Sequence, residues 1–205
     1  MSKICVLGQG YIGLPTALLF ANNGHEVVGI DVNKRVVEAL KAGKISFEEK
    51  GFQELLDEAI TKKAFKAESL VEEADAFLVA VPTPFDSEMR MADLKYVVSA
   101  CEMIVPYLKK GNLVIIESII PPKTCEKQVR YILKKSTSKY CGDFYLSHCS
   151  ERTIPENTLH EMVQNDREIG GVDEKSIQLT AKLYSSFVKV IFTGCLKTQT
   201  TSIIG

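Results

Sequence analysis

The stretch Gly8-Gln9-Gly10-Tyr11-Ile12-Gly13-Leu14-Pro15 decides the fold of this chain. A short apolar run of strand length, 3–7, precedes it, and an apolar run typical of a buried helix face, 16–21, follows it. Between a strand and a helix, a G-x-G-x-x-G pattern indicates dinucleotide binding. Gly8 permits a tight turn, Gly10 leaves room for a pyrophosphate, and Gly13 lets the helix pack closely on the strand. We expect the phosphates to lie on unpaired backbone N–H groups at the helix N-terminus.

A carboxylate follows the second predicted strand, 27–30, at Asp31. There it can accept hydrogen bonds from the adenosine ribose diol and would repel a 2′-phosphate, so the sequence favours NAD over NADP. Two basic residues, Lys34 and Arg35, come soon afterwards, where they could cover the adenine or the ribose, or lie in a solvated first helical turn. The alternative to nucleotide binding is a flavodoxin-like α/β domain in which the glycines serve only packing.

The composition argues against several classes of function. Acidic and basic residues are mixed along the 205 residues and the formal net charge is -1, which gives no electrostatic basis for binding nucleic acid or a membrane surface. No apolar run approaches the roughly 18 residues of a membrane-spanning helix. The N-terminus lacks the pattern of a signal peptide, so we expect a cytoplasmic protein. The 6 cysteines form no C-x-x-C pair, so we expect no metal site and a reducing compartment.

Strands and helices are predicted to alternate along the whole chain. Apolar runs predict strands near residues 3, 27, 65, 76, 113, 144 and 188, with amphipathic helices between most of them. The run 76–81 is apolar on both faces, as in a central parallel strand. The pattern predicts an α/β fold of the doubly wound Rossmann type, with a mostly parallel sheet and helices on both faces, as one domain over 1–205.

Two segments after predicted strands carry local patterns of their own. Pro82-Thr83-Pro84 forms a stiff loop at a strand's carboxyl end, where open α/β sheets bind ligands, and we expect Thr83 to contact the cofactor. The segment 69–73 begins with a capping serine and has a glutamate three positions later, which predicts the start of a helix.

Several motifs, in the same order over nearly the whole chain, resemble the UDP-glucose/GDP-mannose dehydrogenase family. They are Gly8-x-Gly10-Tyr11-Ile12-Gly13-Leu14-Pro15-Thr16-Ala17, Val81-Pro82-Thr83-Pro84, Glu117-Ser118 with Pro121-Pro122, Ser150-Glu151-Arg152 through Pro155, and Asn165-Asp166-Arg167 with Ile169-Gly170-Gly171. The resemblance is closest to the members that act on UDP-N-acetylmannosamine or similar N-acetylhexosamines. It implies an NAD-dependent 6-dehydrogenase that oxidises the sugar C6 alcohol to a carboxylate in two steps, through an aldehyde held on a cysteine.

The resemblance also implies site residues, position by position. The NAD contacts would be Gly8, Gly10, Tyr11, Ile12, Gly13, Asp31, Arg35, Thr83 and Glu117. Glu151 matches the acidic residue that the family uses near the reacting C6 to order or deprotonate water, and Arg152 and Thr153 match positions in the nucleotide-sugar pocket. A base of this kind should lie in a cleft with a raised pKa. The alternative for Glu151 is a surface salt bridge with Arg152.

The chain also departs from the family pattern. Ile119 replaces a threonine, Lys123 and Glu156 replace glycines, Ser150 replaces a proline, and Thr200 and Ile203 stand where the family has an acidic residue and then a lysine. The family's later asparagine, its nucleophilic cysteine, its central dimerising helix and its UDP-binding domain would be absent. A motif around Cys195 imitates the cysteine motif but falls too early in the chain.

We therefore expect the N-terminal, NAD-binding portion of a nucleotide-sugar 6-dehydrogenase. Its substrate would be a UDP-sugar, and full-length family members are homo-oligomers. The portion would be inactive alone, because the thiol that traps the aldehyde is missing. The alternative is a diverged, non-catalytic nucleotide-binding protein.

Overall fold

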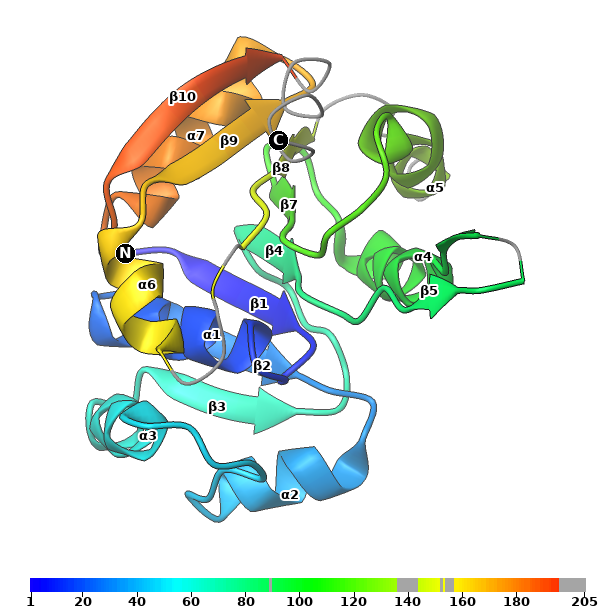
Figure 1. The fold of residues 1–205 in the computed structure, drawn as a ribbon. Coiled ribbons are helices and arrows are strands. Elements are labelled where there is room, and N and C mark those ends of the chain that lie inside the picture. The colour runs from blue at the N-terminus through cyan, green and yellow to red at the C-terminus, as the bar shows by residue number, and fades with distance from the viewer. Residues whose placement is uncertain (89, 136–143, 152, 154–156, 196–205) are drawn as a thin grey trace.

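The structure, a computed structural model, describes residues 1–88, 90–135, 144–151, 153 and 157–195, and is built on one large sheet with helices on both faces (Figure 1). Its eight strands follow the order β10-β9-β8-β7-β4-β1-β2-β3, while β5 and β6 form a separate two-stranded hairpin. The strands are β1 (Lys3–Leu7), β2 (Glu26–Ile30), β3 (Phe65–Glu68), β4 (Ala76–Val79), β5 (Phe85–Asp86), β6 (Met91–Ala92), β7 (Leu113–Ile116), β8 (Tyr145–His148), β9 (Arg167–Gly171) and β10 (Val190–Cys195). The helices are α1 (Gly13–Asn22), α2 (Lys34–Lys41), α3 (Phe52–Thr61), α4 (Lys95–Ile104), α5 (Arg130–Lys134), α6 (Thr158–Gln164) and α7 (Glu174–Tyr184), with a 3-10 turn η1 (Val105–Tyr107) and a π turn η2 (Cys125–Val129).

The strand directions confirm the predicted doubly wound, mostly parallel sheet. From β3 through β2, β1, β4 and β7 to β8, neighbouring strands pair in parallel. This order, 3-2-1-4-7-8, has the connectivity of dinucleotide-binding folds. β9 then pairs antiparallel to β8, and β10 pairs parallel to β9.

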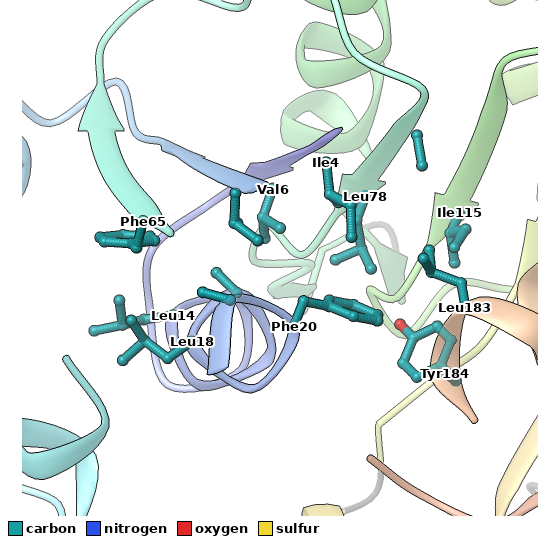
Figure 2. Close-up of a cluster of buried hydrophobic side chains, with 14 of the residues drawn as sticks. Ile4, Val6, Leu14, Leu18, Phe20, Phe65, Leu78, Ile115, Leu183 and Tyr184 are labelled. Carbon is teal, nitrogen blue, oxygen red and sulfur yellow. The ribbon is translucent and has the colours of Figure 1, made fainter. Parts of the chain in front are cut away.

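Alternate side chains of β1 enter two hydrophobic cores on opposite faces of the sheet. Ile4 and Val6 pack in one cluster with buried residues of α1, α2, α3 and α7. Cys5 and Leu7 pack in the other, with residues of α4, η2 and α5. In the first core Phe20 of α1 meets Tyr184 of α7 edge to face, with ring centroids 5.2 Å apart (Figure 2). Because both faces are buried, the central strands read as continuous apolar runs.

Two sequence expectations about secondary structure were wrong or incomplete. The segment 69–75 forms no helix. Since β2 and β1 lie between β3 and β4, this connection crosses three strand spacings of about 4.8 Å and also returns along the strand direction. Seven helical residues rise only about 10 Å, whereas the same length of extended chain reaches roughly 23 Å. The crossing distance therefore overrides the capping pattern.

The strand β9 was not predicted, because its sequence has a charged start and two glycines at its end. Those features lower strand propensity. The last glycine has a packing reason, since a Cβ on Gly171 would lie 2.7 Å from Ile177 Cγ1 and 2.8 Å from the Asp173 carbonyl oxygen. The close approach of α7 to β9 therefore requires glycine there. Within the described ranges no helix is long and apolar enough to cross a membrane.

The turn between β1 and α1 depends on two glycines that touch each other. A Cβ on Gly13 would lie 1.9 Å from the Gly8 carbonyl oxygen and 3.0 Å from the Ala80 Cβ. Gly8 itself has φ +93°, and a Cβ there would lie 2.5 Å from the Ala80 carbonyl oxygen. The predicted roles of these two glycines in the turn and in close packing are consistent with this geometry.

Gly13→Ala should lower the free energy of unfolding by about 3 kcal/mol or more, because backbone atoms rather than a flexible side chain fill the space. The matched control is Gly10→Ala, since a Cβ on Gly10 meets nothing within 4 Å. Urea unfolding of both variants measures the difference. Equal stability of the two variants would show that the loop can move aside and that the contact does not constrain the fold.

Candidate functional site

The candidate site lies at the carboxyl ends of β1 and β4. The loop after β1 leads to α1 on one face, and the loop after β4 leads to α4 on the opposite face (Figure 1). The two loops touch, because the Ala80 N–H donates to the Leu7 carbonyl oxygen at 2.9 Å and Gly8 packs on Ala80. A position where neighbouring parallel strands lead to helices on opposite faces is called a topological switch point. Open α/β sheets bind ligands there.

The start of α1 is open to an anion. A Cβ added to Gly10 would meet nothing within 4 Å. In the part of the chain that the structure describes, no acceptor pairs with the backbone N–H groups of residues 10–13. The first turn of α1 has no acidic residue, so the positive end of the helix dipole is not neutralised locally. Unpaired N–H groups, an open approach and this dipole are what a diphosphate requires.

Asp31 lies directly beside the glycine loop, as the sequence predicted. Its Oδ2 accepts a hydrogen bond from the Gln9 N–H at 2.8 Å, and its Oδ1 accepts one from the Asn33 N–H at 2.8 Å. Both bonds hold the half-buried carboxylate at the end of β2 with its lone pairs only partly used. A ribose diol beside the loop would meet this carboxylate.

Gln9 is a structural part of the site that the sequence analysis missed. Its side chain is 2% exposed, and its Nε2 donates to the Val6 carbonyl oxygen at 2.8 Å and to that of Gly8 at 3.2 Å. The side chain occupies space left by Gly29 of β2, where a Cβ would lie 2.5 Å from Gln9 Oε1. An amide behind the loop thus fixes its shape. A glycine within an otherwise apolar strand could have indicated this close approach.

The loop after β4 is tied to the end of β7 by side-chain hydroxyls. Ser118 Oγ donates to the Val81 carbonyl oxygen at 2.7 Å and accepts from the Val81 N–H at 3.0 Å. Thr83 Oγ1 donates to the Ile119 carbonyl oxygen at 2.7 Å. Thr83, predicted to contact the cofactor, therefore lies at the mouth of the site, next to the exposed Ile119 side chain.

The remaining predicted cofactor residues differ in position. Tyr11 is 52% exposed and its ring lies 4.3 Å from that of Phe47, between centroids. Arg35 is exposed in the first turn of α2, where its N–H donates to the Asn33 side chain. Glu117 follows β7, but its side chain is fully buried beneath the site. It therefore supports the site from the protein interior.

Three charged side chains meet in that interior. Glu117 Oε1 accepts from Thr16 Oγ1 at 3.2 Å, from the Tyr184 hydroxyl at 3.0 Å and from Arg167 Nη1 at 3.3 Å. The same Nη1 forms an ion pair with Glu151 Oε2. The Arg167 guanidinium also lies 5.2 Å from the centre of the Tyr184 ring. We call Glu117, Glu151 and Arg167 the buried charge cluster.

Strand direction explains this meeting. Because β9 runs antiparallel to β8 with Ser147 opposite Gly171, its first residue, Arg167, lies beside Glu151, which follows β8. Glu151 is 7% exposed, so it is a buried partner of Arg167 and not part of a surface salt bridge. Arg152 lies outside the described residues, and Thr153 is half-buried. Arg167 belongs to the motif Asn165-Asp166-Arg167, but the sequence alone predicts no role for it.

Burial shifts the titration of the groups around the buried charge cluster. It raises the pKa of Glu117 to about 7, with the positive charge of Arg167 opposing the rise and the negative charge of Glu151 adding to it. Burial also raises the pKa of the Cys149 thiol to about 12 and that of Tyr184 well above its usual value. Both of these groups are therefore neutral at pH 7.

Two other departures from the family pattern can be placed. Lys123 has φ +67°, a conformation that glycine adopts most readily, which gives a physical reason for the glycine usual there. Cys195 pairs in register with Gly171, at the opposite end of β9 from Arg167. Thr200 and Ile203 lie outside the described residues.

An open parallel sheet with a bare glycine turn at its switch point holds a dinucleotide in one way, with the diphosphate on the helix N-terminus. The fold and the site thus define a Rossmann-type dinucleotide-binding domain. The chain belongs to the UDP-glucose/GDP-mannose dehydrogenase family, since the family model for the NAD binding domain matches residues 2–188. Its cofactor is NAD.

Individual relatives agree with this family. The UDP-N-acetyl-D-mannosamine dehydrogenase of Methanococcus maripaludis (strain C7) is 45% identical over 192 residues, which cover 92% of this chain and 43% of that protein. The Campylobacter jejuni protein of the same name is 40% identical over 195 residues, which cover 92% of this chain and 48% of that protein. The solved UDP-N-acetyl-mannosamine dehydrogenase of Staphylococcus aureus superposes with a TM-score of 0.89 at 39% identity, over 97% of this chain and 48% of that one. The chain spans less than half the length of these relatives.

The raised pKa of Glu117 predicts a pH-dependent stability. Between its unfolded value of about 4.3 and its folded value near 7, the folded chain binds more protons at this group than the unfolded chain does. The free energy of unfolding should therefore fall as pH rises through this window, by at most about 4 kcal/mol. In Glu117→Gln this component should disappear.

Urea unfolding at pH 5 and pH 8 measures the effect in the native chain and in Glu117→Gln. Glu54→Gln, on the exposed side of α3, serves as the control for a charge change elsewhere. If the native chain and Glu117→Gln show the same pH dependence, Glu117 does not titrate in this window.

Proposed function

We propose that the chain binds NAD across the loops 8–12 and 81–84, and that in the whole protein it is the cofactor half of an NAD-dependent nucleotide-sugar 6-dehydrogenase. The substrate class is a UDP-sugar of the N-acetylmannosamine type. One observation carries the binding proposal: the backbone N–H groups of residues 10–13 have no acceptor among the described residues, a Cβ on Gly10 would meet nothing within 4 Å, and the Asp31 carboxylate is fixed beside the loop.

The cofactor contacts follow from this placement. The backbone of residues 8–13 would receive the diphosphate, and Asp31 the adenosine ribose. Arg35 would lie on the adenosine side and Thr83 on the nicotinamide side. Glu117 would act from behind the site, through the elements that it joins. Bound NAD would supply a hydride acceptor, which the substrate alcohol requires.

Glu151 is the group of this chain that we propose for the substrate reaction. It follows the end of β8, and the ion pair with Arg167 holds it at the same edge of the sheet as the glycine loop. An ionised, fixed carboxylate can orient a water or accept its proton. Arg152 and Thr153, close by in sequence, would contact the nucleotide sugar. The expected cytoplasmic location and homo-oligomeric whole protein rest on the sequence and the resemblance.

The second candidate function is nucleotide binding without catalysis. The observation that favours it is Ile119, whose side chain is 61% exposed beside Thr83, where the family has a hydroxyl. Formation of NADH from UDP-N-acetylmannosamine by the whole protein distinguishes the two candidates. Absence of NADH formation together with intact NAD binding would favour the non-catalytic one.

Millimolar NAD should raise the Tm of the chain, because a ligand at 100 times its Kd adds about 2.7 kcal/mol to the free energy of unfolding. Gly10→Leu should abolish this rise and leave the Tm of the free chain nearly unchanged, since a Cβ at this position meets nothing within 4 Å. Asp31→Asn keeps a hydrogen-bond acceptor but loses the charge, so NAD affinity should fall about tenfold and the preference over NADP should narrow.

Thermal unfolding with and without each cofactor, followed by calorimetric titration, measures these effects. A Tm rise with NAD that persists in Gly10→Leu would place the cofactor away from the glycine loop. No rise with NAD in the native chain would contradict the proposed function itself.

A further inference from the structure

The buried charge cluster joins five elements that are distant in the sequence. Glu117 follows β7, Glu151 follows β8, and Arg167 begins β9, while Thr16 of α1 and Tyr184 of α7 donate hydroxyls to Glu117. The side chains of the three charged residues are 0%, 5% and 3% exposed respectively. Water therefore does little to screen these charges from one another.

The charges in this cluster do not balance. Arg167 supplies one positive charge to two carboxylates, and both contact the same nitrogen, Nη1. Two carboxylates that share one buried partner repel each other, so one of them binds a proton more tightly than it would alone. The cluster is neutral when it holds a single proton.

We propose that Glu117 and Glu151 form a coupled acidic pair joined by Arg167, in which Glu117 holds one proton near neutral pH and Glu151 keeps its negative charge.

Geometry places the proton on Glu117. Its carboxyl group is the more buried of the two, with a side chain 0% exposed against 5% for Glu151. The hydroxyls of Thr16 and Tyr184 can bond to a neutral carboxyl group as well as to an ionised one. The raised pKa of Glu117, whose main cause is burial, agrees with this placement.

Apart from Arg167 and Glu151, the described residues that act on the pKa of Glu117 are Tyr184 and Thr16, and neither carries a positive charge. Tyr184 of α7 and Cys149, which follows β8, are neutral at pH 7 because burial raises both pKa values. His148 of β8 directs its Nε2 to the Ser118 carbonyl oxygen at 3.2 Å. From the described residues of β9, Arg167 is the cation that faces Glu117.

The consequence for the proposed reaction is that Glu117 acts as a positioning residue. While Glu117 holds the proton, Arg167 faces one negative charge, that of Glu151. Glu151 then stays ionised and fixed at the carboxyl edge of the sheet. Loss of that proton at higher pH makes the two carboxylates compete for one guanidinium and raises the proton affinity of Glu151. This use of the pair rests on the proposed function, whereas the sharing of the proton does not.

The test is a carboxyl-carbon NMR titration of the chain labelled with 13C in glutamate, from pH 4 to pH 9. One glutamate resonance should titrate with a midpoint near 7 and be absent from Glu117→Gln. In Glu151→Gln, which removes the competing charge, that midpoint should fall by at least about one pH unit, a tenfold change in proton affinity. A Glu151 that only packed beside Glu117 would leave the midpoint unmoved.

The converse variant tests the other half of the pair. In Glu117→Gln the midpoint of Glu151 should stay at its native, acidic value, because Glu117 already carries its proton when Glu151 titrates and glutamine is equally neutral. Glu54→Gln, on the exposed part of α3, is the matched control and should shift neither midpoint. If Glu151→Gln does not fold, the native chain and Glu117→Gln still decide which residue holds the proton.

Three results would overturn the inference: a Glu117 midpoint below about 5 in the native chain, a Glu151 midpoint in the neutral range in its place, or no shift of Glu117 in folded Glu151→Gln. The Tm rise with NAD is recorded on the same samples. A chain that titrates as proposed but does not bind NAD contradicts the proposed function alone, and the opposite outcome contradicts this inference alone.

Discussion

The structure depends on a close contact among three stretches of backbone that only glycine allows. Gly13 at the start of α1 lies against Gly8, and Gly8 lies against Ala80 at the end of β4. This contact lets α1 begin directly after β1 and pack closely on it. It brings together the loops that follow β1 and β4. It also leaves the N-terminus of α1 facing outward, with Gly10 at the opening. Packing and cofactor binding therefore use different glycines of one motif, and neither use explains the motif alone.

Behind this contact, the protein connects its sheet through buried polar groups. Gln9 fixes the loop from below, Ser118 ties the ends of β4 and β7, and Glu117 collects hydrogen bonds from α1 and α7. A buried charge without compensation is expensive, and removal of one partner of a buried pair is more destabilising than its presence is stabilising. We therefore interpret the buried charge cluster as a group of contacts that holds the surrounding strands and helices in fixed positions. It joins the edge that would hold the substrate to the helix that would hold the cofactor.

Much of the fold could be predicted from the sequence because burial on both faces makes the central strands uniformly apolar. The position of Asp31 was predictable too, since the loop, helix and second strand form one local unit. The role of Gln9 left only an indirect signal, the glycine at position 29 within an apolar strand, because the contact joins two strands. The meeting of Arg167 with Glu117 and Glu151 was beyond the sequence, since it follows from β9 running antiparallel to β8. Long-range pairing of this kind leaves little trace in local periodicity.

A crystal structure of the chain with NAD tests the central claim most directly. The account predicts the diphosphate oxygens within hydrogen-bond distance of the backbone N–H groups of residues 10–13, and the adenosine ribose hydroxyls on the Asp31 carboxylate. Gly8 and Gly13 should keep their contact in that complex. A diphosphate bound elsewhere, or an Asp31 side chain turned away from the ribose, would contradict it.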